Sequence, residues 1–140
     1  MFKELCGYVN NPAFWNEFNH PVVSRGNLKY YLPKFCERVK YLADEKDLPE
    51  SYLEGFARTM AIRKFRVSCR RYYNTNAYTE EDRKNGGKHL RSVADCYEWI
   101  ALQMGVSEKL LEDIRLGTDA RFSNSLLSCN DAGSVLQGGV

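Results

Sequence analysis

The clearest constraint on the fold is an unbroken apolar stripe between residues 88 and 104. Seven apolar side chains recur there at spacings of three and four residues, which places them on one face of an α-helix. They are Leu90, Val93, Ala94, Tyr97, Ile100, Ala101 and Met104. A helix that is apolar along one full face needs other elements to cover it. The chain is therefore expected to fold around this segment as an all-α protein.

Shorter apolar patterns predict the helices that pack on this segment. Asn11 and Pro12 together predict the start of a helix. The Asn11 side chain can accept hydrogen bonds from the free amides of the first turn, and proline is favourable at the first helical position because it has no amide proton. Residues 22–27 are expected to form a loop. A stronger helix is predicted to open at Pro33 and a third at about Pro49, since apolar side chains at helical spacing follow both prolines.

The rest of the chain is predicted to contain one polar loop and a short last helix. Residues 74–87 are rich in turn-favouring side chains, and Thr79 precedes a single helical turn within them. A short helix is expected over 121–127. The sequence therefore predicts one domain at 1–132, a single compact helical bundle of about five helices, followed by a flexible tail at 133–140.

Composition favours a soluble intracellular protein. Of 140 residues, 44% are apolar and 27% are charged, which is ordinary for a globular chain. No apolar run approaches the length of a membrane span, and the N-terminal residues do not form a secretory signal. The five cysteines include no CxxC pair, so they are expected to be reduced thiols in the core. The prediction is a cytoplasmic location without membrane contact.

The chain carries no recognisable catalytic motif. It lacks the phosphate-binding GxxxxGK(S/T) loop, the zinc-binding HExxH helix, the GxSxG nucleophile turn and the HxE…PCxxC deaminase pattern. Its two histidines, His20 and His89, lie far apart in the sequence. We expect a non-enzymatic protein with no catalytic residue, no cofactor and no metal site.

Positive charge is concentrated in one segment. Residues 58–91 hold ten basic side chains against three acidic ones, although the net charge of the whole chain is only +2. On a helix, Arg63, Arg66 and Arg70 share a face, because spacings of three and four residues return to the same side. Arginine binds phosphates and tyrosine stacks on exposed bases, so this segment is a candidate nucleic-acid surface. Its candidate residues are Arg63, Arg66, Arg70, Arg71, Tyr73, Lys88 and Arg91.

Two kinds of partner are compatible with this surface: nucleic acid (DNA or RNA) and an acidic protein surface. The first makes the chain a regulatory nucleic-acid-binding protein. The second makes it a protein-binding module, such as an inhibitor, an adaptor or a phage or virion assembly component, and a homo-oligomer is possible. Such a module would use the same basic face or the aromatic N-terminal residues Phe14, Trp15 and Phe18. A third option is internal pairing of the basic residues with Glu108, Glu112 and Asp113.

The stretch Tyr97–Gly117 has the pattern of two helices around a tight turn. Ala101 provides a small residue where the helices cross, Gly105 lies at the turn, and Ser107 can cap the second helix. The positions expected to be buried between the helices are Ile100, Met104, Val106, Leu111 and Ile114. These 21 residues resemble a helix-turn-helix of the Cro/repressor type, in which Gly117 would close the second helix.

The resemblance implies that the second helix enters the major groove of DNA. The side chains that would approach bases and backbone there are Ser107, Glu108, Lys109, Glu112 and Asp113. Three of these five are acidic and repel phosphates. We therefore expect this corner to be part of the scaffold, and the arginine-rich segment before it to be the nucleic-acid surface.

Overall fold

The computed structural model describes the backbone of residues 1–132 and the side chains of residues 1–123. This part of the chain forms helices and turns without strands, which confirms the predicted all-α class. Its seven α-helices are α1 (Phe2–Val9), α2 (Pro12–Glu17), α3 (Arg25–Glu45), α4 (Leu53–Tyr73), α5 (Glu80–Lys84), α6 (Lys88–Gln103) and α7 (Glu108–Ala132), with 3-10 turns at Glu50–Tyr52 and Thr75–Ala77. The predicted tail at 133–140 lies outside the described residues.

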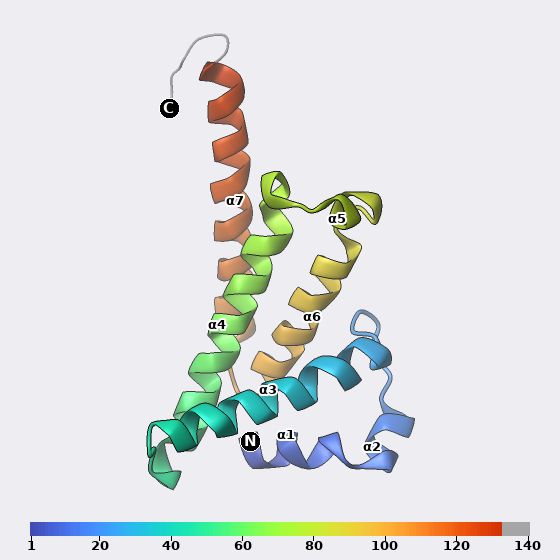
Figure 1. Ribbon diagram of the computed structural model, residues 1–140, viewed down its shortest axis with the longest axis vertical. Helices are drawn as coiled ribbons and strands as arrows, with labels where there is room; N and C mark the ends of the chain where they lie inside the picture. Colours follow the sequence, from blue (N-terminus) through green and yellow to red (C-terminus); the bar gives the residue numbers. More distant parts are fainter. Residues whose placement is uncertain (133–140) are drawn as a thin grey trace.

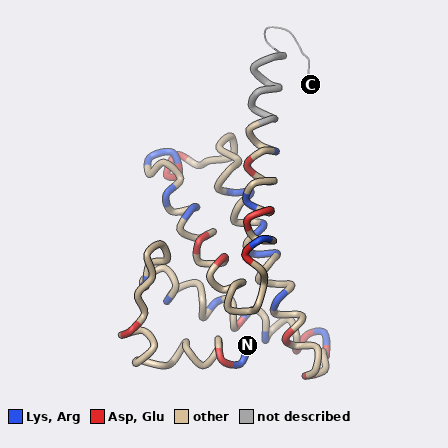
Figure 2. Tube along the Cα trace, turned by 180° about the vertical axis from the view of Figure 1, so that it is seen from behind, with Lys and Arg blue, Asp and Glu red and all other residues tan. Residues whose placement is uncertain are grey.

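The pair α4 and α6 forms the centre of the bundle. These two helices pack on each other more extensively than any other pair. Helix α3 crosses in front of both, α1 and α2 lie along one end, and α7 packs along α4 from the opposite side (Figures 1 and 2). The bundle therefore presents two different grooves beside α4, one towards α3 and one towards α7.

Four small side chains are completely buried in the two central helices. Ala57 and Ala61 on α4, and Ala94 and Ala101 on α6, have no solvent-exposed surface. Because alanine ends at Cβ, small residues of this kind allow neighbouring helices to pack closely. We call these four residues the alanine seam.

Several predicted helix boundaries are confirmed by their hydrogen bonds. The Asn11 side chain accepts from the amides of Ala13 and Phe14, so α2 begins as expected. Thr79 forms a reciprocal capping box at the start of α5. Ser107 Oγ accepts from the amide of Leu110 at 3.1 Å in the first turn of α7.

The predicted start of a helix at Pro33 is wrong. Helix α3 begins at Arg25, inside the expected loop, and Pro33 lies within it. The side chain of Ser24 accepts from the amide of Asn27 at 3.1 Å and caps the first turn. The apolar face also starts earlier than expected, since Leu28 is completely buried. This cap and the burial of Leu28 and Leu32 outweigh the backbone hydrogen bond that proline cannot make.

The predicted end of a helix at Gly117 is also wrong. Helix α7 continues through this glycine, and the short helix expected over 121–127 is part of the same element. The preceding turn is fixed by tertiary contacts, because Leu111 and Ile114 are buried. The cost of a glycine inside a helix, about 1 kcal/mol, is small beside such packing. Among the described residues, no helix has the length and apolarity needed to cross a bilayer.

Candidate nucleic-acid interface

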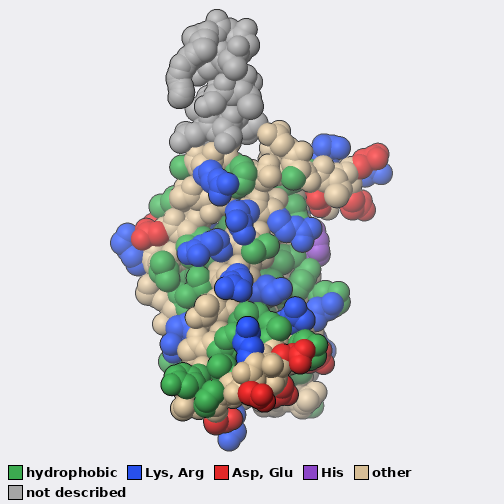
Figure 3. Space-filling model, turned by 60° about the vertical axis from the view of Figure 1, so that its left-hand side comes forward, with side chains coloured by type: hydrophobic (Ala, Val, Ile, Leu, Met, Phe, Trp, Pro, Cys, Tyr) green, Lys and Arg blue, Asp and Glu red, His purple; other side chains and the backbone are tan. Residues whose placement is uncertain are grey.

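The exposed side of α4 carries the arginines that the sequence placed on one face. Arg63, Arg66 and Arg70 are all exposed. In Figure 3, Lys and Arg side chains run down this face of the molecule, whereas Asp and Glu lie mainly at its margins. The predicted helical face is therefore present, and it forms a ridge between the two grooves beside α4.

The groove towards α3 consists of two adjoining hollows. The first, about 200 Å³, is lined from α3, α4 and α6 by residues that include Tyr31, Lys64, Arg71, His89 and Tyr97. The second, about 350 Å³, is lined by Lys34, Phe35, Glu37, Arg38, Tyr41, Lys64 and Tyr97. Because Lys64 and Tyr97 line both hollows, we treat them as one continuous α3–α4–α6 groove.

Cations outnumber carboxylates along this groove. Its lining includes Lys34, Arg38, Lys64 and Arg71, with Glu37 as the acidic residue. Among the side chains that the structure describes, neither Lys64 nor Arg71 forms an ion pair. A concave surface of one charge sign concentrates the electric field and attracts ions of the opposite sign. The groove is therefore suited to bind a polyanion.

Tyrosine rings accompany these cations. Lys34 Nζ lies 4.5 Å from the ring centre of Tyr30, and the Arg38 guanidinium carbon lies 5.8 Å from that of Tyr41. The Lys34 ammonium donates a hydrogen bond to the Tyr30 hydroxyl oxygen, which raises the pKa of Lys34. Cation–ring pairs of this kind hold charged side chains in place without neutralising them.

A chain of aromatic contacts connects the rim of the groove to its floor. The rings of Tyr30 and Tyr31 meet edge-on at 4.9 Å, and Tyr31 lies 5.9 Å from Tyr97 on α6. The Tyr31 hydroxyl is also within hydrogen-bond distance of His89 Nε2, at 3.3 Å. Burial raises the pKa of Tyr97 to about 12, so this phenol is neutral at physiological pH. Aromatic side chains of α3 and α6 therefore pack on one another and form the floor of the groove.

The second groove lies between α4 and α7. It has a volume of about 430 Å³ and is lined by Arg66, Arg70, Leu110, Asp113, Ile114, Gly117, Thr118 and Arg121. Leu110 is 39% exposed here. This α4–α7 groove combines arginines with apolar surface and one carboxylate, whereas the α3–α4–α6 groove combines cations with tyrosines.

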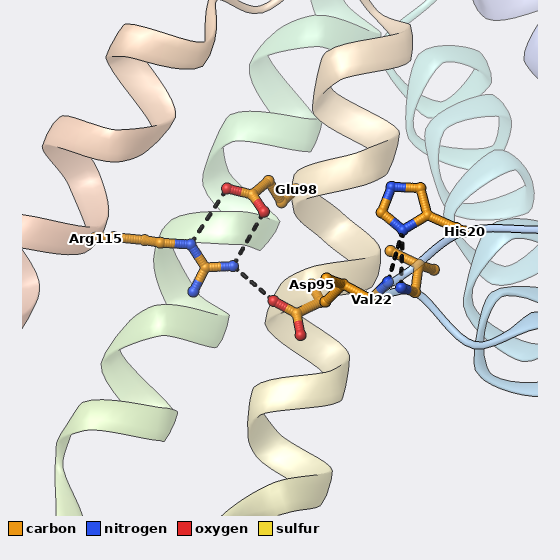
Figure 4. Close-up of polar contacts among 6 residues, drawn as sticks. His20, Val22, Asp95, Glu98 and Arg115 are labelled. Carbon is orange, nitrogen blue, oxygen red and sulfur yellow. Dashed lines mark hydrogen bonds and ion pairs between the residues drawn. The ribbon is translucent and has the colours of Figure 1, made fainter.

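A separate, half-buried cluster of charges joins α6 to α7. Arg115 on α7 donates to Asp95 at 2.8 Å and to both oxygens of Glu98 at 3.2 Å, and both acids lie on α6 (Figure 4). The guanidinium also lies 5.1 Å from the ring centre of Phe65. Burial raises the pKa of Asp95, although the charge of Arg115 opposes the shift. Asp113, considered above as a counter-charge for α4, pairs with Lys109 at 3.0 Å.

The remaining predicted nucleic-acid residues do not all lie at the α3–α4–α6 groove. Lys88 and Arg91 are exposed on α6, and neither lines the α3–α4–α6 groove. Arg91 lies one turn from Asp95 and lowers its pKa, so it belongs to the side of α6 that meets α7. Tyr73 is half-buried, and its pKa is raised by this burial. Of the seven predicted residues, only Arg71 lines the α3–α4–α6 groove.

The aromatic N-terminal residues form an internal cluster. Trp15 is buried, and its indole nitrogen donates to the carbonyl of Val9 at 3.1 Å. The Phe14 ring stacks on Tyr8 at 4.2 Å, while the Phe18 ring contacts Trp99 of α6 at 5.6 Å. Phe14, Trp15 and Phe18 therefore attach α2 to α6, and most of the apolar surface expected for a protein interface is used in packing.

The prediction missed the part of the groove that α3 contributes. Tyr30, Lys34, Arg38 and Tyr41 follow one another at spacings of four, four and three residues, which places them on one helical face. That signal is present in the sequence. The pattern is lost if the helix starts at Pro33, because Tyr30 and Tyr31 then lie in the preceding loop and not on the helical face.

Comparisons of this chain with family models, curated proteins and solved structures give no match. The function therefore has to be argued from the surface itself.

Proposed function

We propose that the protein is a non-enzymatic, cytoplasmic regulatory protein that binds nucleic acid through the α3–α4–α6 groove. One observation carries this proposal: four cations and a row of tyrosines line a single concave surface built from three helices. Lysine and arginine contact phosphates, and tyrosine rings contact bases or sugars. The proposal includes no catalytic step.

The exposed arginines of α4 extend this surface. Arg63 lies on the ridge next to the groove residue Lys64, where a bound backbone leaving the groove meets a further positive charge. Gly105, in the turn between α6 and α7, has a φ of 84°, a left-handed conformation that glycine tolerates best. In this proposal the corner is scaffold, because the α7 residues Glu108, Glu112 and Asp113 are exposed and acidic.

The proposal is tested by binding and its dependence on salt. Fluorescein-labelled mixed-sequence 20-mers, single-stranded and duplex, are titrated with protein while fluorescence anisotropy is recorded from about 50 to 200 mM salt. Four phosphate contacts predict a slope of about −3 for log K against log salt. The double variant Lys64→Gln/Arg71→Gln should bind at least tenfold more weakly with a slope nearer −1.5, because two contacts are lost.

A matched control removes the same charge elsewhere. Lys3 and Lys46 are exposed, and neither lines the groove. Lys3→Gln/Lys46→Gln should therefore bind almost as tightly as the unmodified protein. Absence of binding to either probe at the lowest salt would falsify the proposal, as would equal losses in the two double variants.

The α4–α7 groove favours a second candidate function, that of a protein-binding module. Its arginines line the same groove as Leu110 of α7, which is 39% exposed. Arginine next to apolar surface is a typical composition for a protein interface. In this case Arg66→Glu/Arg70→Glu should abolish a complex that survives nuclease treatment, while Lys64→Gln/Arg71→Gln should retain it. The opposite pattern would favour the nucleic-acid groove.

A further inference from the structure

We infer that the α3–α4–α6 groove binds single-stranded rather than duplex nucleic acid, and that unpaired bases stack on Tyr30 and Tyr41. The inference rests on the proposed function and adds the class of nucleic acid to it. Its evidence is the position and exposure of these two tyrosines.

Both rings are unusually open to solvent. Tyr30 is 56% and Tyr41 is 55% exposed; Tyr41 lines the second hollow, and Tyr30 contacts its lining residue Lys34. An exposed aromatic ring contributes little to folding, because most of its apolar surface stays in contact with water. Stacking with a flat apolar ligand would bury that surface.

The spacing of the two rings matches a strand that runs along α3. Tyr30 and Tyr41 are eleven residues apart on one helical face, which corresponds to about 16 Å at 1.5 Å per residue. Stacked nucleotides rise about 3.4 Å each, so about five nucleotides cover this distance. Lys34 and Arg38 lie between the two rings, at positions where the intervening phosphates would pass.

A duplex would leave this arrangement largely unused. Its bases are already paired and stacked, so it offers phosphates and groove edges to the protein rather than free base faces. The hollows between the helices, about 200 and 350 Å³, lie at or below the lower end of the size range of small-ligand pockets and are too small to receive a double helix. Extruded bases can use both the rings and the hollows.

The cation–ring pairs explain how the two exposed tyrosine rings keep a fixed orientation. Lys34 lies over Tyr30, and the rings of Tyr30 and Tyr31 meet in a T-shaped contact. Arg38 lies over Tyr41, whose hydroxyl donates to Glu45 at 3.2 Å. Ring faces fixed in this way are prepared for stacking, which lowers the entropy cost of binding.

The test compares nucleic-acid probes and tyrosine variants by fluorescence anisotropy at one salt concentration. The probes are fluorescein-labelled dT15 and rU15 and a duplex of 15 base pairs. The single strands should bind at least tenfold more tightly than the duplex, and affinity in a dT length series should level off near six nucleotides. Equal affinity for dT15 and rU15 would indicate that the protein recognises bases and phosphates alone. Tighter binding of rU15 would indicate a further contact to the 2′-hydroxyl. Both results support a single-stranded ligand.

Three variants locate the stacking residues. Tyr30→Leu/Tyr41→Leu should lose at least tenfold in affinity for dT15, because each stacked base contributes about 1–3 kcal/mol. Tyr30→Phe/Tyr41→Phe keeps both rings and should bind within threefold of the unmodified protein. Tyr52→Leu is the matched control, since Tyr52 is 63% exposed, lies in the 3-10 turn after α3 and lines neither hollow; it should change nothing. Circular dichroism verifies that each variant is folded.

Two results would overturn the inference. One is duplex binding as tight as single-strand binding, and the other is unchanged dT15 binding by Tyr30→Leu/Tyr41→Leu. If binding in either case still depends on Lys64 and Arg71, the proposed function stands and only the single-strand inference fails. If none of the three probes binds, both fail.

Discussion

Two regions of the molecule use arginine in opposite ways. Between α6 and α7, the side chain of Arg115 is 20% exposed and is held by two carboxylates. In the α3–α4–α6 groove, Arg71 is exposed and has no ion-pair partner among the described side chains. The first arrangement fixes α7 against α6. The second leaves positive charge available for a ligand.

This difference shows that burial and pairing separate structural charge from binding charge. A buried ion becomes costly when its partner is removed, because it loses both water and its counter-charge. An exposed ion stays hydrated and can be replaced at little cost to the fold. Charge counts along the sequence do not make this distinction, so the comparison has to be tested by substitution.

The largest expected effect follows from removing the buried cation. Arg115→Met keeps an apolar stem of similar length but leaves Asp95 and Glu98 without their counter-charge. We expect the free energy of unfolding to fall by about 2–4 kcal/mol. This loss is smaller than that for a fully buried ion pair, because the cluster is partly solvated. Urea unfolding followed by circular dichroism measures the change. A loss under 1 kcal/mol would mean that the cluster behaves as a surface pair.

The next effect concerns Tyr97, which lines the groove but is 8% exposed. Its pKa is raised from 10.0 to about 12, so the unfolded state releases this proton before the folded state does. The corresponding stability is complete below pH 10 and is lost as the pH rises towards 12, by about 1.4 kcal/mol per pH unit. Unfolding of Tyr97→Phe between pH 9 and 12 should show a shallower decline than that of the unmodified protein. Parallel curves would contradict burial of this phenol.

A smaller effect of opposite sign is expected in the groove. Lys64→Gln/Arg71→Gln keeps the side-chain stems and removes two like charges, so the free energy of unfolding should rise slightly, by less than about 0.5 kcal/mol. Nucleic-acid affinity should fall in the same protein. Thermal unfolding monitored beside the binding assay gives both values, and a clear destabilisation would show that these cations support the fold.

The smallest effect is expected at an exposed ion pair on α7. Lys109 and Asp113 are 3.0 Å apart, with side chains 83% and 54% exposed. Pairs of this kind contribute about 0.5 kcal/mol or less. Urea unfolding of Lys109→Gln should therefore differ from the unmodified protein by no more than this amount. A change comparable to that of Arg115→Met would remove the distinction between the two regions.

Local patterns were sufficient to predict much of the bundle. The stripe from Leu90 to Met104 predicted α6, and the side chains of Asn11 and Thr79 marked the beginnings of α2 and α5. These features depend on neighbours close in sequence. The errors at Pro33 and Gly117 arose where tertiary packing stabilised a helix against a residue that disfavours it.

The candidate site was harder to predict than the fold. Helical spacing correctly joined Arg63, Arg66 and Arg70, but it could not tell which groove each side chain faces. It also could not predict that α3 crosses α4 and brings Lys34 and Arg38 next to Lys64. The α6 acids Asp95 and Glu98 bind Arg115, and this pairing depends on how α7 returns along the bundle. Such relations between distant segments are set by the assembled core.

The alanine seam has a consequence for how this protein can change over time. Because Ala61 and Ala101 are completely buried in the core, a larger side chain at either position would force its neighbours to move. The groove cations Lys64 and Arg71 are not among the buried residues, so substitutions there leave the core packing intact. Substitutions of a few groove side chains can therefore change which ligand is bound without changing the fold. Larger residues at the four buried alanines, by contrast, would disturb the helix packing on which the groove depends.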